Sequence, residues 1–438
     1  MLIGFKIKNY RSFNDLQHFT MLAGKVRNNE NHIVNIGKHK VLKFSGMFGA
    51  NGSGKSNLIL AMSFVQTLIN NGVGSIIDNQ YFRGNKGNPE NDSYFEYEIS
   101  LNNKLYSYGF EINISKKMIV SEWLIDMTKP TEKVIFERDV KKGTINTDLK
   151  SKNDYFNICL LEMKKNTSEL FIKEMFRRIA MSNNQDPFFD DIKNVFKFLV
   201  YDTIIIRPSA HKLFDIDYVK KKEKILKILG ALDINIVDIV PEECDIKKVE
   251  NKLPPEVFND IKRNFELLSQ KSKNANLTLR IENDLYIINK DSSNAYNVQS
   301  LKFIHSNNDE TFGAFDESDG TIRILELIDI LISHNKLFLI DELDSSLHPA
   351  LVDGLLKIFL QSNSDNQLII TTHELKTLDF DLVRRDEIWF AEKNECGESR
   401  IYSLEEFKDV ARFDRKIDKA YMEGRFGAIA NIDVNYEN

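Results

Sequence analysis

The chain has 438 residues, of which 42% are hydrophobic and 28% are charged, and its 59 basic and 65 acidic side chains give a formal charge of −6. This length is enough for two or three average domains, or for one large domain with insertions, and the low glycine and proline content excludes collagen-like or low-complexity disorder. The sequence has no run of about 18 apolar residues that would span a membrane, and its acidic balance argues against a uniformly basic nucleic-acid-binding surface, although it allows a local basic groove.

The first third of the chain predicts short strands around one buried helix. Alternating apolar and charged residues predict a half-buried strand at residues 3–7, and further strands are expected at 18–23 and 41–48. The apolar pattern at 56–70 predicts a helix that lies in the core. Four aromatic and β-branched runs between 93 and 140 alternate with Asn, Lys and Pro breaks, which predicts an antiparallel meander.

Helical spacing of apolar residues dominates the middle of the chain. It predicts helices through residues 153–273, interrupted by one strand at 199–208, before β character returns at 277–303. The last third alternates again between helices and strands. The expected elements there are a helix at 321–333, a strand at 337–340, a helix at 349–360, a strand at 367–371 and a β-hairpin within 386–407.

Cysteine usage and the first residues bear on the cellular compartment. Cys159, Cys244 and Cys396 lie far apart and form no C-x-x-C pair, so neither a disulfide framework nor a zinc ribbon can be built from them. Lysines and an arginine interrupt the apolar residues of MLIGFKIKNYRSF, which therefore lacks the apolar core of a signal peptide. We expect a reducing, cytoplasmic location.

A glycine-rich segment follows the strand predicted at 41–48 and reads GANGSGKS, which matches the phosphate-loop pattern G-x-x-x-x-G-K-S. Glycines allow consecutive backbone N–H groups to turn toward a phosphate, and the N-terminus of the next helix adds a partial positive charge. Lys55 would reach the β- and γ-phosphates of ATP, and the Ser56 hydroxyl would ligate Mg²⁺. The expected nucleotide-binding residues of this Walker A motif are Gly49, Asn51, Gly52, Ser53, Gly54, Lys55 and Ser56.

An acidic motif lies far downstream. The apolar stretch KLFLI leads into Asp341 and Glu342, which places two carboxylates at the carboxyl end of a strand, where α/β sheets bind ligands. Asp341 would hold the Mg²⁺ shell, and Glu342 would polarise the attacking water, as in a Walker B motif. A strand followed by an ordinary acidic turn is the alternative interpretation. His373 follows the next predicted strand, whose end should lie beside the first.

The long separation of Lys55 from Asp341 distinguishes classes of P-loop protein. Compact GTPase and kinase-like folds place these elements far closer together, so a large insertion between two halves of one sheet is required. We expect an N-terminal ATPase half at 1–150, a mainly helical insertion at 151–300 that forms an arm or lid, and a C-terminal ATPase half at 301–438. A transporter ATPase is disfavoured, since those subunits lack so long an insertion.

Taken in order, GANGSGKS, the S-D-G-T at 318–321, LFLIDELDSSLHP and TTH resemble the head domains of ABC-type ATPases, a group that includes SMC, Rad50, RecF and OLD-like proteins. DELDSSLHP and the opening IKNYRSF are similar to the RecF/OLD-like branch labelled AAA15 or AAA21. The resemblance covers about 1–110 and 300–400. It implies the α/β class, with an ABC-type P-loop ATPase head, an antiparallel β-lobe and a helical insertion, and with ATP and Mg²⁺ as cofactors.

The resemblance also implies roles for residues outside the Walker motifs. Ser318, Asp319 and Gly320 would form the signature that caps the γ-phosphate bound by the opposite subunit, which requires a homodimer or a higher homo-oligomer. An isolated S-D-G-T is an ordinary helix N-cap in most proteins. Asp344 would lie in the D-loop, and His373 would be the switch histidine.

The resemblance also assigns roles to two residues of the N-terminal half. Arg11, within N-Y-R-S-F, matches the position that approaches the nucleotide in this group. Gln80 is a candidate for the Q-loop glutamine, although its spacing fits the family poorly.

The segment after His373 bears on whether this chain carries a nuclease of its own. OLD-like ATPases often carry a Toprim nuclease here, which needs a glutamate and a later D-x-D pair for two metals. Glu423 suits the first requirement but no D-x-D follows, so we expect no nuclease in this chain. The sequence AYMEGRFGAIA resembles the endings of ATPase subunits in two-gene phage-defence systems of the AbiL, RloA and PARIS types, and in the PARIS type the ATPase pairs with a separate Toprim effector. A docked terminal helix with an extended tail is the structural alternative, and both interpretations can hold together.

These observations support three functional hypotheses. The first is an ATP-gated sensor and scaffold in bacterial antiviral defence that controls a separately encoded toxin or nuclease, with DNA or a phage protein as trigger and no membrane partner. The second is a RecF-like DNA-repair ATPase, and the third is a catalytically idle nucleotide-gated assembly module. Two basic segments, Lys220–Lys224 with Lys227 and Lys173 with Arg177 and Arg178, would contact DNA phosphates or an acidic partner, although a solvated helix face is the more ordinary interpretation.

Overall fold

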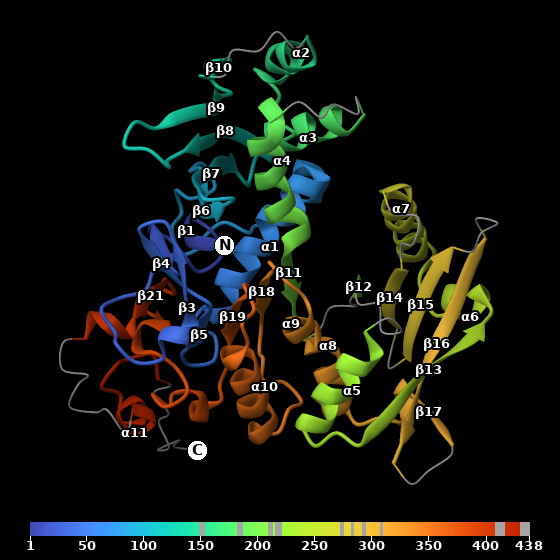
Figure 1. Ribbon diagram of the computed structural model, residues 1–438. Coiled ribbons are helices and arrows are strands. Elements are labelled where there is room, and N and C mark those ends of the chain that lie inside the picture. The colour runs from blue at the N-terminus through green and yellow to red at the C-terminus, as the bar shows by residue number, and fades with distance from the viewer. Residues whose placement is uncertain are drawn as a thin grey trace, which may run out of the picture. The chain divides into compact units, whose positions relative to one another are not determined.

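The computed structural model consists of two compact units, each formed by separate stretches of the chain (Figure 1). The first unit contains Met1–Ile205, His334–Leu343 and Asn363–Asn438, and the second contains Ile206–Ser333 and Asp344–Ser362. The structure describes residues 1–148, 154–181, 187–208, 213–214, 221–271, 276–281, 284–290, 295–306, 310–407 and 417–429. No helix within these ranges is long and apolar enough to cross a membrane.

A six-stranded sheet lies at the centre of the first unit. Its strands are β5 (Phe44–Phe48), β11 (Thr203–Ile206), β18 (Leu337–Ile340), β19 (Gln367–Thr371), β20 (Ile388–Lys393) and β21 (Ser399–Ser403). They follow the order β11-β18-β19-β5-β20-β21, in which β18, β19, β5 and β20 run parallel and β21 turns back against β20. β18, β19 and β5 are buried along their whole length, as expected for parallel strands that are covered on both faces.

A second sheet of the first unit is antiparallel and contains the predicted meander. Its strands are β1 (Leu2–Lys8), β2 (Gln17–Thr20), β6 (Ser93–Leu101), β7 (Lys104–Asn113), β8 (Met118–Asp126), β9 (Lys133–Asp139) and β10 (Thr144–Asn146), in the order β10-β9-β8-β7-β6-β1-β2. The half-buried strand predicted at 3–7 is confirmed as β1: Ile3, Phe5 and Ile7 are buried, whereas the lysines on the other side are partly or fully exposed. Lys6 reaches the carboxylates of Glu96 and Glu98 on β6, at 3.1 and 2.6 Å.

Helices and a hairpin complete the first unit. They are α1 (Lys55–Asn71), α2 (Asp154–Met163), α3 (Phe171–Met181), α4 (Asp190–Lys197) and α11 (Ile417–Met422), with the hairpin of β3 (Ile33–Ile36) and β4 (His39–Leu42). The buried helix predicted at 56–70 is confirmed as α1. A π-helical turn, Phe198–Asp202, follows α4, and Gln66 on α1 donates hydrogen bonds to three carbonyls at and just after this turn. These bonds attach α1 to the turn that follows α4.

The second unit combines an antiparallel sheet with helices. Its strands are β12 (Leu213–Phe214), β13 (Ile236–Cys244), β14 (Asn276–Ile281), β15 (Asp284–Lys290), β16 (Tyr296–His305) and β17 (Thr311–Gly313). Its helices are α5 (Lys222–Ala231), α6 (Ile246–Glu250), α7 (Pro255–Lys271), α8 (Asp319–Leu327), α9 (Asp329–Ile332) and α10 (Pro349–Gln361). Apolar residues of α5, β13, β16 and α8 form a common core.

The predicted elements are largely confirmed, but the single strand expected at 41–48 is divided between β4 and β5, which belong to different sheets. The α/β class, the antiparallel meander, the strands within 277–303 and the alternating helices and strands of the last third are all present. The helical periodicity at 153–273 was wrong for β13, which pairs with β16 along its length. Its Ile and Val residues favour a strand, but the partner strand lies some 60 residues further along the chain, where local periodicity gives no signal. The helix expected at 321–333 is divided into α8 and α9.

Candidate nucleotide-binding site

The loop between β5 and α1 needs glycine at defined positions. Gly49, Gly52 and Gly54 have φ angles of +152°, +73° and +109°, a backbone conformation that residues with a side chain rarely adopt. A Cβ atom on Gly49 would lie 2.3 Å from the carbonyl oxygen of Ala391, and one on Gly54 would lie 2.3 Å from Ser399 Oγ. The loop is therefore packed closely against β20 and β21, and this packing fixes the curvature that a phosphate-binding loop requires.

The polar groups of this loop suit an anionic ligand. Lys55 begins α1, is only 5% exposed, and its ammonium group donates to the carbonyl oxygens of Gly49 and Ala50 at 2.7 and 3.0 Å. Ser53 Oγ is buried without a hydrogen-bond partner in the structure. A buried hydroxyl without a hydrogen-bond partner destabilises the folded protein unless a ligand forms the missing hydrogen bond. Asn51 and Gly52 are exposed at the tip of the loop, and Ser56 is half-buried in the first turn of α1.

The acidic pair lies directly after β18. Asp341 is 6% exposed, whereas Glu342 is exposed and has a φ of +51°. The Thr371 hydroxyl, at the end of β19, donates to Asp341 Oδ1 at 2.7 Å and accepts the backbone N–H of Glu342 at 2.8 Å. A non-glycine residue in the left-handed region is held there only by its surroundings, and such residues gather at functional sites.

Strand register brings these motifs to one edge of the parallel sheet. Ile340 on β18 lies opposite Ile370 on β19, and Thr371 on β19 lies opposite Met47 on β5. The exposed His373 therefore follows β19 at the level where the phosphate loop follows β5. Since adjacent strands are spaced by roughly 4.8 Å, the ends of β18 and β5 are about 10 Å apart across β19. The structure thus places the Walker A loop, Asp341, Glu342 and His373 at the same edge.

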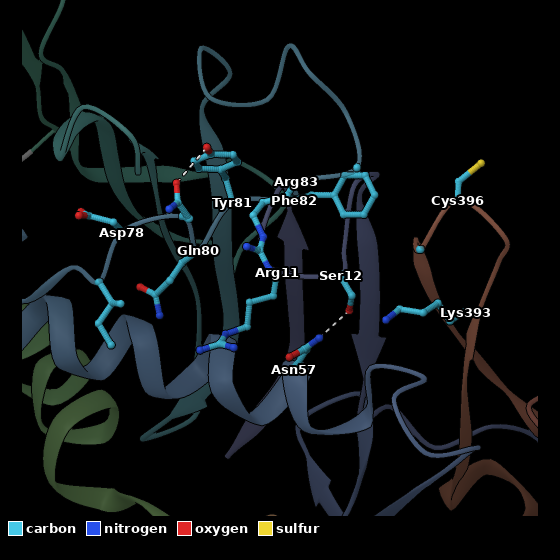
Figure 2. A pocket seen from close by; sticks show the side chains of 14 residues that line it. Arg11, Ser12, Asn57, Asp78, Gln80, Tyr81, Phe82, Arg83, Lys393 and Cys396 are labelled. Carbon is cyan, nitrogen blue, oxygen red and sulfur yellow. Dashed lines mark hydrogen bonds between the residues drawn. The ribbon is translucent and has the colours of Figure 1, made fainter.

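A pocket of about 570 Å³ lies beside the start of α1 (Figure 2). Its lining includes Arg11, Asn57 and Lys393, which come from the loop after β1, from α1 and from the end of β20. Ser12 Oγ accepts a hydrogen bond of 2.6 Å from Asn57 Nδ2, and the Arg11 backbone N–H donates to the carbonyl of Gln80 at 2.7 Å. Arg11 and Gln80 therefore lie at the same pocket. Its volume is in the range of small-ligand sites.

The sequence did not point to several residues of this pocket. Arg83 and Lys393 bring further positive charge to its lining, and both are exposed. Lys393 could have been suspected, since it ends a predicted strand at the carboxyl edge of the sheet. Ser12 adjoins Arg11, but the pattern N-Y-R-S-F did not reveal that its hydroxyl accepts from Asn57 and lies near Gly54.

The predicted signature and D-loop residues lie in the second unit. Ser318 is the N-cap of α8, and its side chain accepts the Thr321 N–H at 3.1 Å, so the ordinary capping role is present. Ser318 and Asp319 are exposed. A Cβ on Gly320 would lie 3.1 Å from the carbonyl oxygen of Ser346. Ser346 has a φ of +62° and belongs to the turn that begins at Asp344. Within this unit the signature segment and the turn after Asp344 are therefore neighbours.

Four residues of the basic segments form ion pairs within the described part of the chain. Lys173 lies 2.7 Å from Glu169, and Arg177 and Arg178 both bind the carboxylate of Glu174 at 2.8 and 2.7 Å. Lys222 lies 2.7 Å from Asp238, whereas Lys220 is outside the described residues. At these four positions the pairs favour the solvated helix face over a surface prepared for DNA phosphates.

The glycine-rich loop between β5 and α1 and the acidic pair after β18 lie at one edge of a parallel sheet, which is the arrangement of a P-loop domain. The sequence matches the AAA_21 family, described as "AAA domain, putative AbiEii toxin, Type IV TA system", over residues 44–194 and 236–379. This match spans more than half of the chain, and the protein belongs to that family.

Solved structures of SMC heads are among those similar to this chain. The crystal structure of an SMC head bound to the C-terminal winged-helix domain of ScpA has 14% sequence identity and a TM-score of 0.41, covering 92% of this chain and 99% of that one. The SMC head domain from Thermotoga maritima has 14% identity and a TM-score of 0.40, covering 92% of this chain and 98% of that one. The comparison with curated proteins gave no significant match.

Proposed function

We propose that this chain binds ATP with Mg²⁺ and hydrolyses it at sites completed by a second copy of the chain. The observation that carries the proposal is the shared edge of the parallel sheet, where the glycine-rich loop and Lys55 lie with Asp341 and Glu342. Loop N–H groups, the Ser53 hydroxyl and Lys55 would hold the phosphates. Glu342 would orient the attacking water, with the exposed His373 as the switch residue beside it.

The donor set suits Mg²⁺ better than a metal that needs an all-protein cage. Within the described ranges no group of three or more His, Cys, Asp or Glu side chains is arranged to hold a metal ion. Mg²⁺ keeps several waters and is usually bound by one or two carboxylates together with substrate phosphates. Ser56 and Asp341 would hold the ion, which would neutralise charge on the phosphates. The Thr371 hydroxyl keeps the Asp341 carboxylate oriented.

Two substitutions separate binding from hydrolysis. Lys55→Ala should abolish both ATP binding and turnover, whereas Glu342→Gln should bind ATP as tightly as the wild type and stop hydrolysis. Glu132→Gln, at an exposed position in the turn between β8 and β9, is the matched control and should leave both unchanged. Nucleotide binding is measured by calorimetry and turnover by phosphate release with and without Mg²⁺. Unchanged turnover in Glu342→Gln would favour the idle assembly module instead.

We further propose that the ATPase acts as a sensor and scaffold in antiviral defence, and that a separate protein carries the toxic activity. The family description, with its putative toxin and type IV toxin–antitoxin system, supports this role, as does the similarity of AYMEGRFGAIA to the endings of two-gene defence ATPases. The ion pairs of Lys173, Arg177 and Lys222 favour solvated helix faces at these positions, so these three residues add no support for a DNA-repair role.

The partner hypothesis is tested by expressing the chain with and without the product of the adjacent gene. We expect the two proteins to co-purify, the partner to be toxic when released, and phage infection to trigger that release. Wild type and Glu342→Gln should differ in how tightly they retain the partner. Growth inhibition by this chain alone, or the absence of both co-purification and phage protection, would contradict the scaffold role.

A further inference from the structure

The segment after α11 folds back onto the phosphate loop. The backbone N–H of Ala50, the second residue of the loop, donates to the carbonyl oxygen of Ala428 at 2.8 Å. The same carbonyl accepts the Tyr421 hydroxyl at 2.9 Å. Residues 417–429, here called the tail segment, therefore make a direct backbone contact with the Walker A motif, which lies at the other end of the sequence.

Close packing fixes the turn that presents this carbonyl. Gly427 has a φ of +68°, and a Cβ on it would lie 2.8 Å from both Glu392 Oε1 and the Tyr402 hydroxyl. That hydroxyl donates to the Phe426 carbonyl at 2.7 Å, and the Ala428 N–H donates to Glu392 Oε1 at 3.2 Å. Ala428 itself is in the left-handed region, with a φ of +57°. β20 and β21 thus hold the turn in one conformation.

Aromatic packing links the same segment to the strand that leads into the loop. Phe390 on β20 stacks on Tyr421 and on Phe426, with ring centroids 5.4 and 5.8 Å apart and interplanar angles of 10° and 14°. Phe48, which directly precedes Gly49, lies 6.4 Å from Phe390. Displacing the tail segment would remove both the hydrogen bond to Ala50 and part of the packing beneath the loop.

We propose that the tail segment is a positioning element for the phosphate loop, which it holds in the conformation that binds ATP. The proposal rests on the proposed ATPase function. A loop with three glycines has many accessible conformations, and ordering it on binding costs affinity, so a contact that orders it beforehand strengthens binding. Glu342 and Asp341 follow a different strand, so the chemical step itself does not depend on the tail segment.

This arrangement also couples ATP to whatever binds the tail segment. If displacement of the segment weakens ATP binding, then bound ATP must hold the segment in place by the same factor, because linkage is reciprocal. A partner protein that captures residues 417–429 would therefore compete with ATP, and the nucleotide state would set how accessible this segment is.

Gly427→Val tests the proposal, because its side chain would collide with Glu392 and Tyr402. We expect a rise in KM and in the ATP dissociation constant of about tenfold or more, with kcat at saturating ATP close to wild type. Gly37→Val is the matched control. Gly37 has a φ of +56°, and a Cβ on it would have no neighbouring atom within 4 Å. This variant therefore has the same kind of backbone strain as Gly427→Val but no collision. Tyr421→Phe, which removes one hydroxyl, should show a smaller change of the same kind. An unchanged KM in both Gly427→Val and Tyr421→Phe, or a fall in kcat alone, would overturn the proposal.

Hydrogen exchange gives a readout that does not require ATP turnover. The Ala50 amide should be protected in the nucleotide-free wild type and in Gly37→Val, and should exchange faster in Gly427→Val and Tyr421→Phe. A wild-type protein that fails to bind ATP would refute the proposed function, while the Ala50 amide would still report on the tail contact. Equal exchange at Ala50 in all four proteins would refute the positioning role by itself.

Discussion

Thr371 bridges the two residues of the acidic motif: its hydroxyl donates to the Asp341 carboxylate at 2.7 Å and accepts the backbone N–H of Glu342 at 2.8 Å. Thr371→Val keeps a similar shape and removes both hydrogen bonds. Loss of a group that orients a metal ligand typically costs about 10–100-fold in metal affinity or activity. We therefore expect Thr371→Val to lower turnover or to raise the Mg²⁺ concentration needed for half-maximal activity by about tenfold or more, measured by phosphate release across a Mg²⁺ titration.

Thr371→Ser is the control for this prediction, because it retains the hydroxyl and loses only a methyl group. It should remain close to the wild type in both turnover and Mg²⁺ dependence. Full activity of Thr371→Val at every Mg²⁺ concentration would show that Asp341 does not need this partner.

The signature residues allow a test of active sites shared between subunits. Ser318→Asp keeps a good N-cap for α8 but places a negative charge where the γ-phosphate of the opposite subunit is expected. This variant should bind ATP through its own phosphate loop and fail to hydrolyse it. When it is mixed with Lys55→Ala, mixed dimers contain one complete site, so ATPase activity should reappear.

Ser318→Asn, which caps a helix equally well without a charge, separates electrostatic repulsion from damage to α8 and should be less impaired. Activity of the mixture that does not exceed the sum of its two components would argue against sites completed by a second subunit.

Gly54 tolerates no side chain, for two reasons that act together. Its φ is +109°, and a Cβ would lie 2.3 Å from Ser399 Oγ and 2.9 Å from Ser12 Oγ. Gly37→Ala carries only the cost of the left-handed conformation, roughly 1–2 kcal/mol. Gly54→Ala should lower the free energy of unfolding by clearly more than this and should also lose ATP binding, as measured by denaturant titration and calorimetry. Equal stability of the two variants would mean that the loop can move away from β21.

Cys159 is buried and should be unreactive, whereas Cys396 is exposed and accessible to reagents. Burial raises the pKa of the Cys159 thiol to about 12. Because the thiolate is the reactive form, maleimide at pH 8 should modify Cys396 in the folded protein and reach Cys159 only after unfolding. Peptide mass mapping over time measures both rates. Rapid modification of Cys159 in the folded protein would contradict the packing of α2.

The raised pKa of Cys159 also sets the sign of a stability effect. The unfolded chain ionises this thiol near its ordinary pKa of about 8.5, while the folded protein keeps it protonated, so stability falls as pH rises from there toward about 12. Cys159→Ala should lose this part of the alkaline destabilisation, measured as the free energy of unfolding between pH 8 and pH 10.

The parts of the site that sequence alone located are those encoded locally. The spacing of Gly49, Gly54 and Lys55 specifies a loop between a strand and a helix, and the apolar run before Asp341 specifies a buried strand with a carboxylate at its end. The partnership of Thr371 with Asp341 depends on the pairing of β18 with β19, which no local pattern contains.

The same reason explains the larger omissions. Local periodicity predicts a helix where β13 forms, because its partner β16 is distant in sequence, and the contact between Ala50 and Ala428 joins opposite ends of the chain. Propensity and periodicity describe neighbours along the chain, whereas these features arise from neighbours across a sheet.

The position of β5 in its sheet has a consequence during synthesis on the ribosome. β5 lies between β19 and β20, so both of its pairing partners emerge only after roughly 300 further residues have been made. Until then Phe44–Phe48 offers two open edges of an apolar strand, the kind of surface that recruits other strands and aggregates. Nascent chains should therefore depend on chaperones until β20 has been translated, and the candidate nucleotide site is among the last parts of the first unit to form.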